Sequence, residues 1–435
     1  MHKTMGSCSR TSNAPASCGR HPALAMSEFF TVLPPDEALA RLFEHLPPAP
    51  QPEGISTAEA LNRVTFEVIR APASLPAFPR STMDGYAVRA QDTFGASQSL
   101  PAYLNLIGEV PMGRAPAFTL APAQAALVHT GGMLPPGADA VVMIEVSQKA
   151  REGEIEILKA VAPGENLLRV GDDIAEGAEI FPAGHRLRPQ DLGGLSALGL
   201  TYITVARRPR VALLATGDEV VPPEAEAQPG QVRDVNSYSV AGQIARAGGV
   251  PLRRGIVPDD FEALRSAAKA ALAEADALVL SAGSSVSVRD MTAEVVNGLG
   301  QPGLLVHGVA VKPGKPTILA AAEGKPIIGL PGNPVSAMVI ADLFVAPTIY
   351  KLQGCPALPP RQSVRARLTH NIASQAGRVD YIPARLITRE GEGWAEPVFD
   401  KSNQIFTLVF ADGMIVIPRD ANGVSAGETV EVRLF

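Results

Sequence analysis

The chain has 435 residues, a formal net charge of −6 and a hydrophobic content of 46%. Domains usually contain about 100–200 residues, so we expect two to four of them. The negative net charge argues against a general nucleic-acid surface, and no uninterrupted apolar run is long enough to cross a bilayer. The three cysteines form no C-x-x-C pair, which fits a reducing compartment and predicts a cytoplasmic protein.

The N-terminal segment is rich in Ser, Asn, Gly and Cys and lacks the apolar core of a signal peptide. We therefore predict a disordered extension over residues 1–26. Apolar residues then recur from Leu39 to Leu46 at the spacing of an amphipathic helix. Ser56 and Glu59 have the spacing of a capping box, which predicts a second, short helix.

The segment from Leu75 to Val146 contains short apolar runs separated by turns rich in Gly and Pro. This pattern predicts a small β-domain. Two of its loops carry Asp84, before a glycine, and Thr130, before two glycines; each sequence is first of all a turn signal. Further on, Asp173 belongs to an acidic pair that lacks the regular ligand spacing of a calcium loop.

From Val211 to about Ala346 the pattern changes to alternating strands and helices. Val211–Ala215 and Ala277–Ser281 are continuous apolar runs, typical of buried parallel strands. Val240–Ala247 and Phe261–Ala275 lie between them and have helical spacing. We therefore predict a doubly wound α/β domain, in which ligands bind beyond the carboxyl ends of the strands.

The C-terminal region follows a cluster of prolines and has the short apolar segments of a small barrel or sandwich. The predicted strands are residues 381–387, 394–398, 413–417 and 429–434.

Two lysines, Lys312 and Lys315, share one proline-stiffened turn. Within about 4 Å of each other, their ammonium groups would repel by roughly 4 kcal/mol at an effective dielectric near 20, and an anion between them would remove that cost. After an apolar hairpin, Asn333 is placed to cap a helix whose first turn contains Ser336, where free N–H groups favour negative charge. Either element alone could be an exposed turn or an ordinary helix start, but together they predict an oxyanion site.

Polar residues also follow the predicted strands of the α/β domain. Glu219 follows the first strand, Gly283-Ser284-Ser285 follow a later one, and Asp259 and Asp290 lie in nearby loops. Small residues let backbone N–H groups approach a phosphate, and neighbouring carboxylates suit Mg²⁺. Alternatively, the acidic pair at 259–260 and Asp290 could cap the helices that follow them.

Several other sites are excluded by the sequence. It contains no G-x-x-x-x-G-K-[ST] loop, which excludes a P-loop NTPase. The glycine and serine run at 283–287 lacks the closing glycine of a nucleophile elbow, and the seven histidines have no zinc-like spacing.

Taken in order, six segments are similar to the molybdopterin molybdenumtransferases, the family of MoeA and the gephyrin E domain. They keep the family order over nearly the whole chain after Met26, and each alone would be a weak signal. The segments are residues 75–88, with Ser-Thr-Met-Asp-Gly-Tyr at 81–86, and residues 130–132, 171–174, 215–219, 312–316 and 329–337.

The resemblance implies Mg²⁺-dependent insertion of molybdate into adenylylated molybdopterin, with release of AMP. The residues that would bind molybdate are Lys312, Lys315, Pro316, Ser336, Arg378 and Ser402. The catalytic residues would be Asp84, Asp173, Glu219, Asp259 and Asp290, of which the last three would hold the metal. The molybdopterin and nucleotide would contact Thr130, Gly283, Ser284, Ser285, Pro331, Gly332, Asn333 and Pro334.

The resemblance also implies a multidomain fold of α/β and β units and an elongated dimer. The units would be an elongated domain I (residues 27–78 and 169–208), an inserted β-domain II (79–168), a MogA-like, doubly wound α/β domain III (209–355) and a β-barrel-like domain IV (356–435). Domains I and II of one subunit would meet the α/β site of the other. Further implied partners are the adenylyltransferase and acceptor molybdoenzymes, with no nucleic acid and no membrane.

Two departures from the family pattern keep alternatives open. Leu167 and Leu168 stand where an arginine often precedes the Gly-x-Asp-Ile motif, and the serine-containing segment 283–290 replaces a more usual glycine-rich one. These changes leave room for a non-catalytic carrier of molybdopterin or of the finished cofactor. A paralogue that inserts tungstate is also open, because the two oxyanions have the same charge and nearly the same size.

Overall fold

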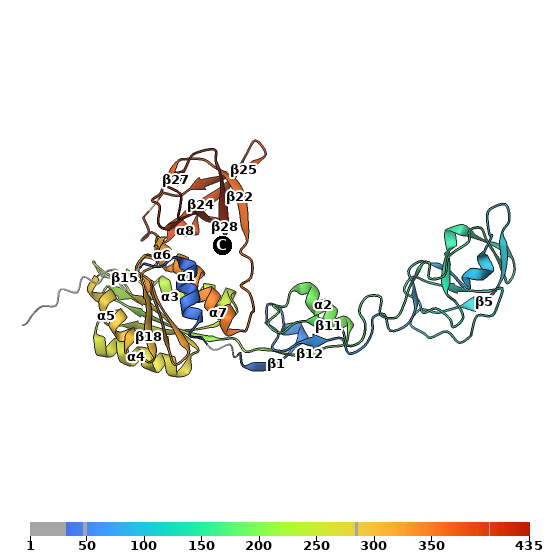
Figure 1. Cartoon of the computed structure of the whole chain (residues 1–435), viewed down its shortest axis with the longest axis horizontal. Coiled ribbons are helices and arrows are strands. Elements are labelled where there is room, and N and C mark those ends of the chain that lie inside the picture. Colours follow the sequence, from blue (N-terminus) through green and yellow to red (C-terminus); the bar gives the residue numbers. More distant parts are fainter. Residues whose placement is uncertain (1–31, 47–49, 283–285, 400) are drawn as a thin grey trace, which may run out of the picture.

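The computed structural model describes residues 32–46, 50–282, 286–399 and 401–435. The predicted extension over residues 1–26 and the site residues Gly283, Ser284 and Ser285 lie outside this range. The chain is elongated (Figure 1): an α/β domain and a C-terminal β-domain lie at one end, a small unit lies in the middle, and a second β-domain lies at the far end.

The α/β domain is built on a six-stranded sheet with the order β16-β13-β17-β21-β20-β18. The first four strands run parallel, and β20 and β18 add antiparallel neighbours at one edge. The predicted parallel strands and the apolar hairpin are thus confirmed. The strand bounds are β13 (Arg210–Thr216), β16 (Val250–Val257), β17 (Ala277–Ala282), β18 (Pro302–His307), β20 (Ile318–Ala322) and β21 (Lys325–Pro331), with a small pair formed by β14 (Val220–Val221) and β15 (Val232–Arg233).

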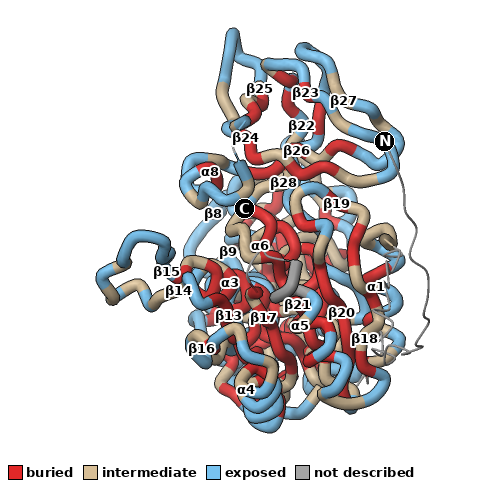
Figure 2. Tube along the Cα trace, turned by 90° about the vertical axis from the view of Figure 1, so that its left-hand side faces the viewer, coloured by how far each residue is buried: buried red, intermediate tan, exposed pale blue. Residues whose placement is uncertain are grey.

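Helices cover both faces of this sheet, because successive strand residues point to opposite sides. In β13, Val211 and Leu213 belong to one buried apolar cluster and Ala212 and Leu214 to the other. Figure 2 shows this buried interior between exposed outer helix surfaces. The helices are α3 (Asn236–Arg246), α4 (Phe261–Glu274), α5 (Val286–Asn297), α6 (Pro334–Ile340) and α7 (Ala346–Leu352), with a π-helical turn η4 (Ala341–Val345) between the last two.

The first helix, α1 (Pro35–Phe43), forms where the apolar spacing predicts it. The predicted domain I includes this segment, but the structure places its buried residues Ala38 and Leu42 in the core of the α/β domain. The segment before this helix is attached to the same domain, since the backbone N–H of Leu33 donates a hydrogen bond to the carbonyl of Gly308 beside β18. The helix therefore packs with a sheet that lies about 270 residues away in sequence.

The C-terminal domain is a five-stranded barrel. Its strands follow the order β24-β25-β22-β28-β26, and a further pairing of β24 with β26 closes the ring. Closure removes the sheet edges of this domain. All four predicted strands are present, and β22 was not predicted. The bounds are β22 (Ser363–Leu368), β24 (Val379–Arg389), β25 (Glu392–Pro397), β26 (Gly413–Ile417) and β28 (Thr429–Leu434), with the short elements β23 (Ile372–Ala373), β27 (Gly423–Val424) and α8 (Phe406–Val409).

The middle unit combines residues that are distant in sequence. Ser56 caps only a 3₁₀ turn, η1 (Thr57–Glu59), where a short helix is predicted. The unit consists of the paired strands β1 (Pro52–Ser56) and β12 (Tyr202–Ala206), the paired strands β2 (Ile69–Arg70) and β11 (Glu179–Phe181), and the helix α2 (Pro189–Ala197). It connects to the far domain through β3 (Arg80–Ser81) and β10 (Leu167–Leu168).

The far domain is the predicted small β-domain. Its six-stranded sheet has the order β7-β4-β6-β5-β9-β8, and apolar residues such as Val88 and Val128 are fully buried in it. The bounds are β4 (Gly85–Val88), β5 (Ala102–Glu109), β6 (Gln124–Val128), β7 (Ala140–Met143), β8 (Ser147–Arg151) and β9 (Glu154–Ile157), with 3₁₀ turns η2 (Ala90–Thr93) and η3 (Ile144–Val146).

One continuous helical segment, Pro334–Leu352, is long and apolar enough by composition to cross a membrane. Its apolar window is 67% buried inside the protein, where Phe344 and Ile349 belong to the α/β core. The apolar character of this segment is therefore explained by packing in that core.

Candidate functional site

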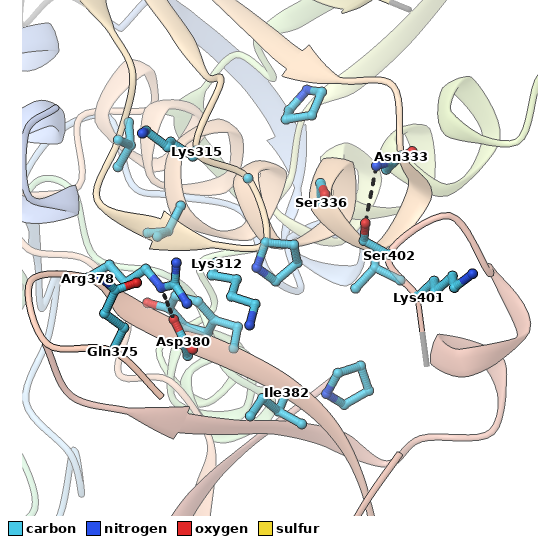
Figure 3. A pocket seen from close by; sticks show the side chains of 18 of the residues that line it. Lys312, Lys315, Asn333, Ser336, Gln375, Arg378, Asp380, Ile382, Lys401 and Ser402 are labelled. Atoms are coloured by element: carbon cyan, nitrogen blue, oxygen red, sulfur yellow. Dashed lines mark hydrogen bonds and ion pairs between the residues drawn. The ribbon is translucent and has the colours of Figure 1, made fainter. Parts of the chain in front are cut away.

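A cavity of 1240 Å³ lies between the α/β domain and the C-terminal barrel. The α/β domain contributes the turn after β19 (Val311–Lys312) and the start of α6, and the barrel contributes β24 and the loop after β25 (Figure 3). The cavity brings together all six side chains predicted to bind molybdate, together with three of the residues predicted to contact molybdopterin. They are Lys312, Lys315, Pro316, Ser336, Arg378 and Ser402, and Pro331, Gly332 and Asn333.

The lysine turn adopts a backbone that requires glycine. Gly314 has φ +117°, and a Cβ atom there would lie 2.6 Å from Cδ1 of Ile340. This close approach presses the turn onto α6, so that Lys312 and Lys315 both reach the cavity. The sequence places their ammonium groups close together, but the structure does not: Figure 3 shows them on different sides of the turn. The two charges therefore act on the cavity from separate positions.

The start of α6 differs from the predicted cap. Asn333 occupies the N-cap position without a side-chain capping bond. Its Nδ2 atom instead donates to Oγ of Ser402 at 3.1 Å, and the backbone N–H of Val335 donates to the Ser402 carbonyl at 3.1 Å. The helix start thus fixes a loop of the barrel, which places Ser402 beside Ser336 in the cavity.

Arg378 is oriented by a buried carboxylate. Its Nε atom donates to Oδ1 of Asp380 at 2.9 Å, and the Asp380 side chain is 2% exposed while that of Arg378 is 32% exposed. The cavity is also lined by Lys401, so among its described lining residues four cations stand against one carboxylate, Asp380. Such an excess of positive charge in a cleft favours a negatively charged ligand.

A second cavity, of 560 Å³, adjoins the first and shares Gly332 and Asn333 with it. It lies beyond the carboxyl ends of β13 and β17 and is lined by Glu219 and Pro334, at the edge where doubly wound sheets bind ligands. Asn236, at the head of α3, donates to Oγ of Ser281 at 2.9 Å and to the Gly332 carbonyl at 2.8 Å.

The amide oxygen of Asn236 has no hydrogen-bond partner among the described residues, although its side chain is buried. A buried polar atom without a partner is costly. Asn236 lines the second cavity, so this unsatisfied oxygen lies in the wall of the candidate ligand site.

The acidic residues of the strand-end loops separate into different roles. Asp260 caps α4 by accepting from the N–H of Ala263 at 2.8 Å, whereas Asp259 accepts from the Thr216 hydroxyl at 2.7 Å. Asp290 lies inside α5 and is exposed, so the alternative that it caps a following helix is wrong. The described parts of the chain contain no group of three or more His, Cys, Asp or Glu side chains placed to hold a metal ion.

Asp84 and Thr130 meet each other in the far domain. The Thr130 N–H and hydroxyl donate to Oδ1 of Asp84 at 2.7 and 3.1 Å. These bonds lower the pKa of Asp84, and the nearby His129 adds to this effect. Asp173 is exposed in the connection to the middle unit, where its N–H donates to Leu75. Within one chain, the far domain lies well away from the lysine turn (Figure 1).

Sequence reasoning missed several residues of the two cavities. Asp380 could have been found, since it is a carboxylate two residues after the candidate Arg378, close enough in sequence for the two side chains to pair. Lys401 is adjacent to Ser402 and has the same charge as the predicted ligands. For Asn236 and Ser281 the sequence has no comparable signal, because their contact joins elements 45 residues apart.

Three family models match the chain in succession. They are the MoeA N-terminal region (domains I and II) over residues 33–199, a probable molybdopterin-binding domain over 212–351, and the MoeA C-terminal region (domain IV) over 365–435. Both cavities are built from the second and third of these regions.

Relatives and solved structures agree with this match. The chain is 32% identical to a molybdopterin molybdenumtransferase of Bacillus subtilis, over 94% of this chain and 96% of that one, and 34% identical to one of Haemophilus influenzae, over 92% and 98%. Crystal structures of molybdopterin biosynthesis MoeA proteins from Pyrococcus superpose with TM-scores of 0.77 and 0.81 at 37% and 31% identity, each covering 93% of this chain and 99% and 100% of the other. The chain therefore belongs to the molybdopterin molybdenumtransferase family.

Proposed function

We propose that this protein inserts molybdate into adenylylated molybdopterin in a Mg²⁺-dependent reaction that releases AMP. The observation that carries the proposal is the convergence of Lys312, Lys315, Arg378, Ser336 and Ser402 on one cavity between two domains. The adjoining strand-end cavity offers a place for the pterin and its nucleotide.

The first cavity suits a tetrahedral oxyanion. Lysine and arginine supply charge-assisted donors from separate directions, and the two serine hydroxyls supply neutral donors. Arg378 keeps its guanidinium group in place through Asp380, so little side-chain entropy is lost when an oxyanion binds. In the proposed reaction, this arrangement holds molybdate while the two dithiolene sulfurs bind molybdenum and one oxo group leaves as water with the two thiol protons, without a change in oxidation state.

The strand-end carboxylates fit Mg²⁺. This ion keeps several waters and uses one or two carboxylates together with substrate phosphates, so three converging protein ligands are not required. Glu219 lines the second cavity, and Asp259 is held by the Thr216 hydroxyl in a nearby loop; these residues would hold the ion, with Asp290 as a further candidate. When bound, Mg²⁺ would neutralise the phosphate charge that develops as AMP leaves.

We further propose that the active assembly is a homodimer. Asp84 and Thr130 are exposed and distant from the two cavities within one chain. If these residues act in the reaction, a second copy must bring them to the site. The partner's far domain would then face the cavity of the first chain.

The first test of the activity is AMP release from adenylylated molybdopterin with Mg²⁺, with molybdate or tungstate added in parallel. We expect release and transfer of active cofactor to an apo-molybdoenzyme with molybdate. Lys315→Ala should weaken oxyanion binding by about 10–100-fold, the range for losing a charged hydrogen bond. Lys269→Ala removes an exposed lysine on α4 and should leave release unchanged.

Each other outcome has a defined meaning. Tight ligand binding without AMP release would replace the transferase proposal by the carrier alternative, and a response to tungstate alone would identify a tungstate-inserting protein. Equal activity of wild type and Lys315→Ala would contradict the assignment of the cavity.

A further inference from the structure

A third cavity, of 310 Å³, lies where three units of the chain meet. The middle unit contributes Arg186, the α/β domain contributes Arg246 and Tyr350, and the barrel contributes Arg361 and Arg433. None of these residues lines the cavities described above, although Tyr381 lines both this cavity and the first one. Its volume falls at the lower end of the range for small-ligand sites.

The lining of this cavity is strongly basic. Among the described residues that line it, four are arginines and one, Asp342, has an acidic side chain. Asp342 pairs with Arg361 at 3.3 Å, and Arg433 lies 3.6 Å from Glu431. In the described part of the chain, neither Arg186 nor Arg246 forms an ion pair with an acidic side chain. Arg186 and Arg246 therefore have no acidic side chain of the described residues within ion-pair distance, and neither forms an ion pair with the α-carboxylate of Phe435, which also lines the cavity.

Two aromatic rings hold arginines at the cavity. The guanidinium carbon of Arg186 lies 5.7 Å from the ring centre of Tyr350, and that of Arg433 lies 5.7 Å from the ring centre of Tyr381. Arginines held against aromatic faces still present their N–H groups for paired bonds to a phosphate or carboxylate. Burial raises the pKa of Tyr381, and the nearby charges of Arg433 and Arg361 oppose this rise.

The remaining lining is apolar. Met338, Pro347, Pro359 and Met414 face the cavity beside the two tyrosines. The combination of unpaired guanidinium groups with an apolar and aromatic wall distinguishes this site from the polar oxyanion cavity. It suits a ligand with an anionic end and a flat apolar part.

We propose that the third cavity binds a small organic phosphate ester, whose phosphate group contacts Arg186 and Arg246 and whose apolar part lies between Tyr350 and Tyr381. A bound ester would connect the middle unit, the α/β domain and the barrel. The first cavity also lies between the α/β domain and the barrel and shares Tyr381. The ester would therefore hold these two domains together and strengthen oxyanion binding in the first cavity. Binding of the ester does not depend on the proposed reaction, whereas its effect on oxyanion binding rests on the proposed molybdate site.

Phenyl phosphate is a suitable probe. Its binding is measured by calorimetry on the full-length Lys312→Ala/Lys315→Ala variant, which lacks the competing oxyanion site. We expect saturable binding that persists in this variant. Arg186→Ala and Arg246→Ala, added singly, should each weaken binding by at least about tenfold, as loss of a charge-assisted bond does. Arg254→Ala removes a charge paired with Glu274 away from the cavity and is the matched control.

Absence of saturable binding, or equal weakening by Arg254→Ala, would overturn the proposal. In a chain with intact lysines, phenyl phosphate at saturation should tighten molybdate binding severalfold, and Arg186→Ala should abolish this gain. An unchanged molybdate affinity at saturation would overturn the coupling of the two cavities. Inactivity of the protein toward adenylylated molybdopterin would leave these binding results standing, so the two proposals fail separately.

Discussion

Arg378 illustrates how one residue serves both binding and stability. Its partner Asp380 is almost fully buried, and a buried carboxylate without a partner is expensive. Arg378→Ala should therefore lower the free energy of unfolding of the barrel by about 1–3 kcal/mol and also weaken molybdate binding. Arg378→Lys keeps the charge but not the planar donor geometry, so it should retain more stability than affinity.

Urea unfolding and molybdate calorimetry on the same samples check this prediction. Arg367→Ala is the control, since Arg367 pairs with Glu392 at 3.3 Å on the exposed surface of the same domain, where an ion pair contributes about 0–1 kcal/mol. If Arg378→Ala is no less stable than Arg367→Ala, the buried pair does not have the role assigned to it.

Gly314 tests whether the backbone of the lysine turn matters. Gly314→Ala adds an atom that meets Ile340 at 2.6 Å and forces a non-glycine residue to φ +117°. We expect a loss of about 1–3 kcal/mol and weaker molybdate binding, because both lysines must move. Gly391→Ala, in the β24–β25 turn and outside the lining of the cavity, is a useful comparison: it has φ +82° but no atom within 4 Å of the new Cβ, so it isolates strain from the clash. Molybdate affinity equal to wild type in Gly314→Ala would contradict the role of the turn.

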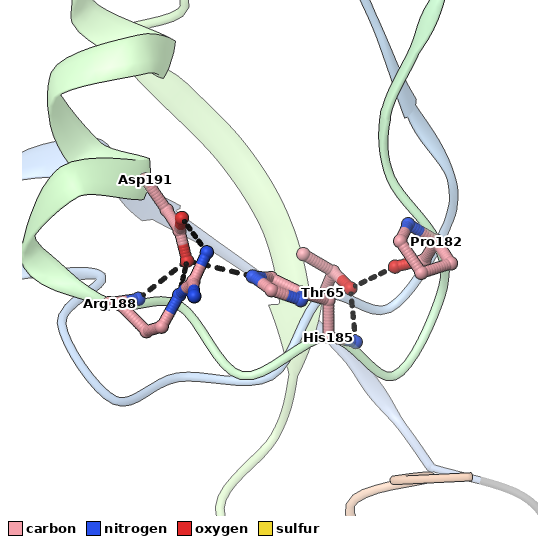
Figure 4. A network of polar contacts seen from close by, with 5 residues as sticks. All are labelled: Thr65, Pro182, His185, Arg188 and Asp191. Atoms are coloured by element: carbon pink, nitrogen blue, oxygen red, sulfur yellow. Dashed lines mark hydrogen bonds and ion pairs between the residues drawn. The ribbon is translucent and has the colours of Figure 1, made fainter.

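At the scale of elements, the start of α2 contains a network that predicts acid sensitivity (Figure 4). Asp191 accepts from the Arg188 guanidinium and backbone N–H at 2.9 and 2.8 Å, and its Oδ2 lies 2.7 Å from Nε2 of His185. Burial alone would raise the pKa of Asp191, but these contacts outweigh it and lower the pKa to about 2 from its ordinary 3.8. Thr65 extends the network, because its Oγ1 accepts a hydrogen bond from the backbone N–H of His185.

The sign of the pH effect follows from the lowered pKa. The carboxylate stabilises the middle unit fully above about pH 4, and this contribution of about 2 kcal/mol disappears as the pH falls toward 2. We expect the protection factors of the α2 amides, which are corrected for the intrinsic pH dependence of exchange, to fall over that range in the wild type. Asp191→Asn should already have low protection factors near neutral pH and should lose this acid dependence; a dependence retained in the variant would assign it to another group.

Elements that depend on local pattern could be predicted from the sequence, and those that depend on distant contacts could not. The strands β13 and β17 and the helix α4 have apolar runs or periods that are visible within about 15 residues. The position of α1 on the α/β core depends on a contact with Gly308, and the bond from Asn333 to Ser402 crosses between domains. The capping prediction for Asn333 failed because local spacing does not reveal that its side chain finds a tertiary partner, and the one for Asp290 failed because α5 begins four residues earlier, at Val286.

At the scale of the whole molecule, the elongated shape separates two sets of candidate residues. The lysine turn and Arg378 lie at one end, and Asp84 and Thr130 lie at the other (Figure 1). Single-chain catalysis would require the far domain to fold back across the middle unit. A symmetric pair of chains would instead bring the far domain of each to the cavity of the other, with two identical sites.

Mixing two defective variants, at a molybdate concentration too low for Lys315→Ala to bind it, distinguishes these arrangements. Asp84→Ala damages only the far domain and Lys315→Ala only the cavity, so a mixed dimer would contain one site with both defects and one intact site. After random exchange of subunits at equal concentrations, half the dimers are mixed, and we expect recovery of about a quarter of the wild-type AMP release. If each chain carried its whole site, every site would contain a defect and mixing would recover no activity.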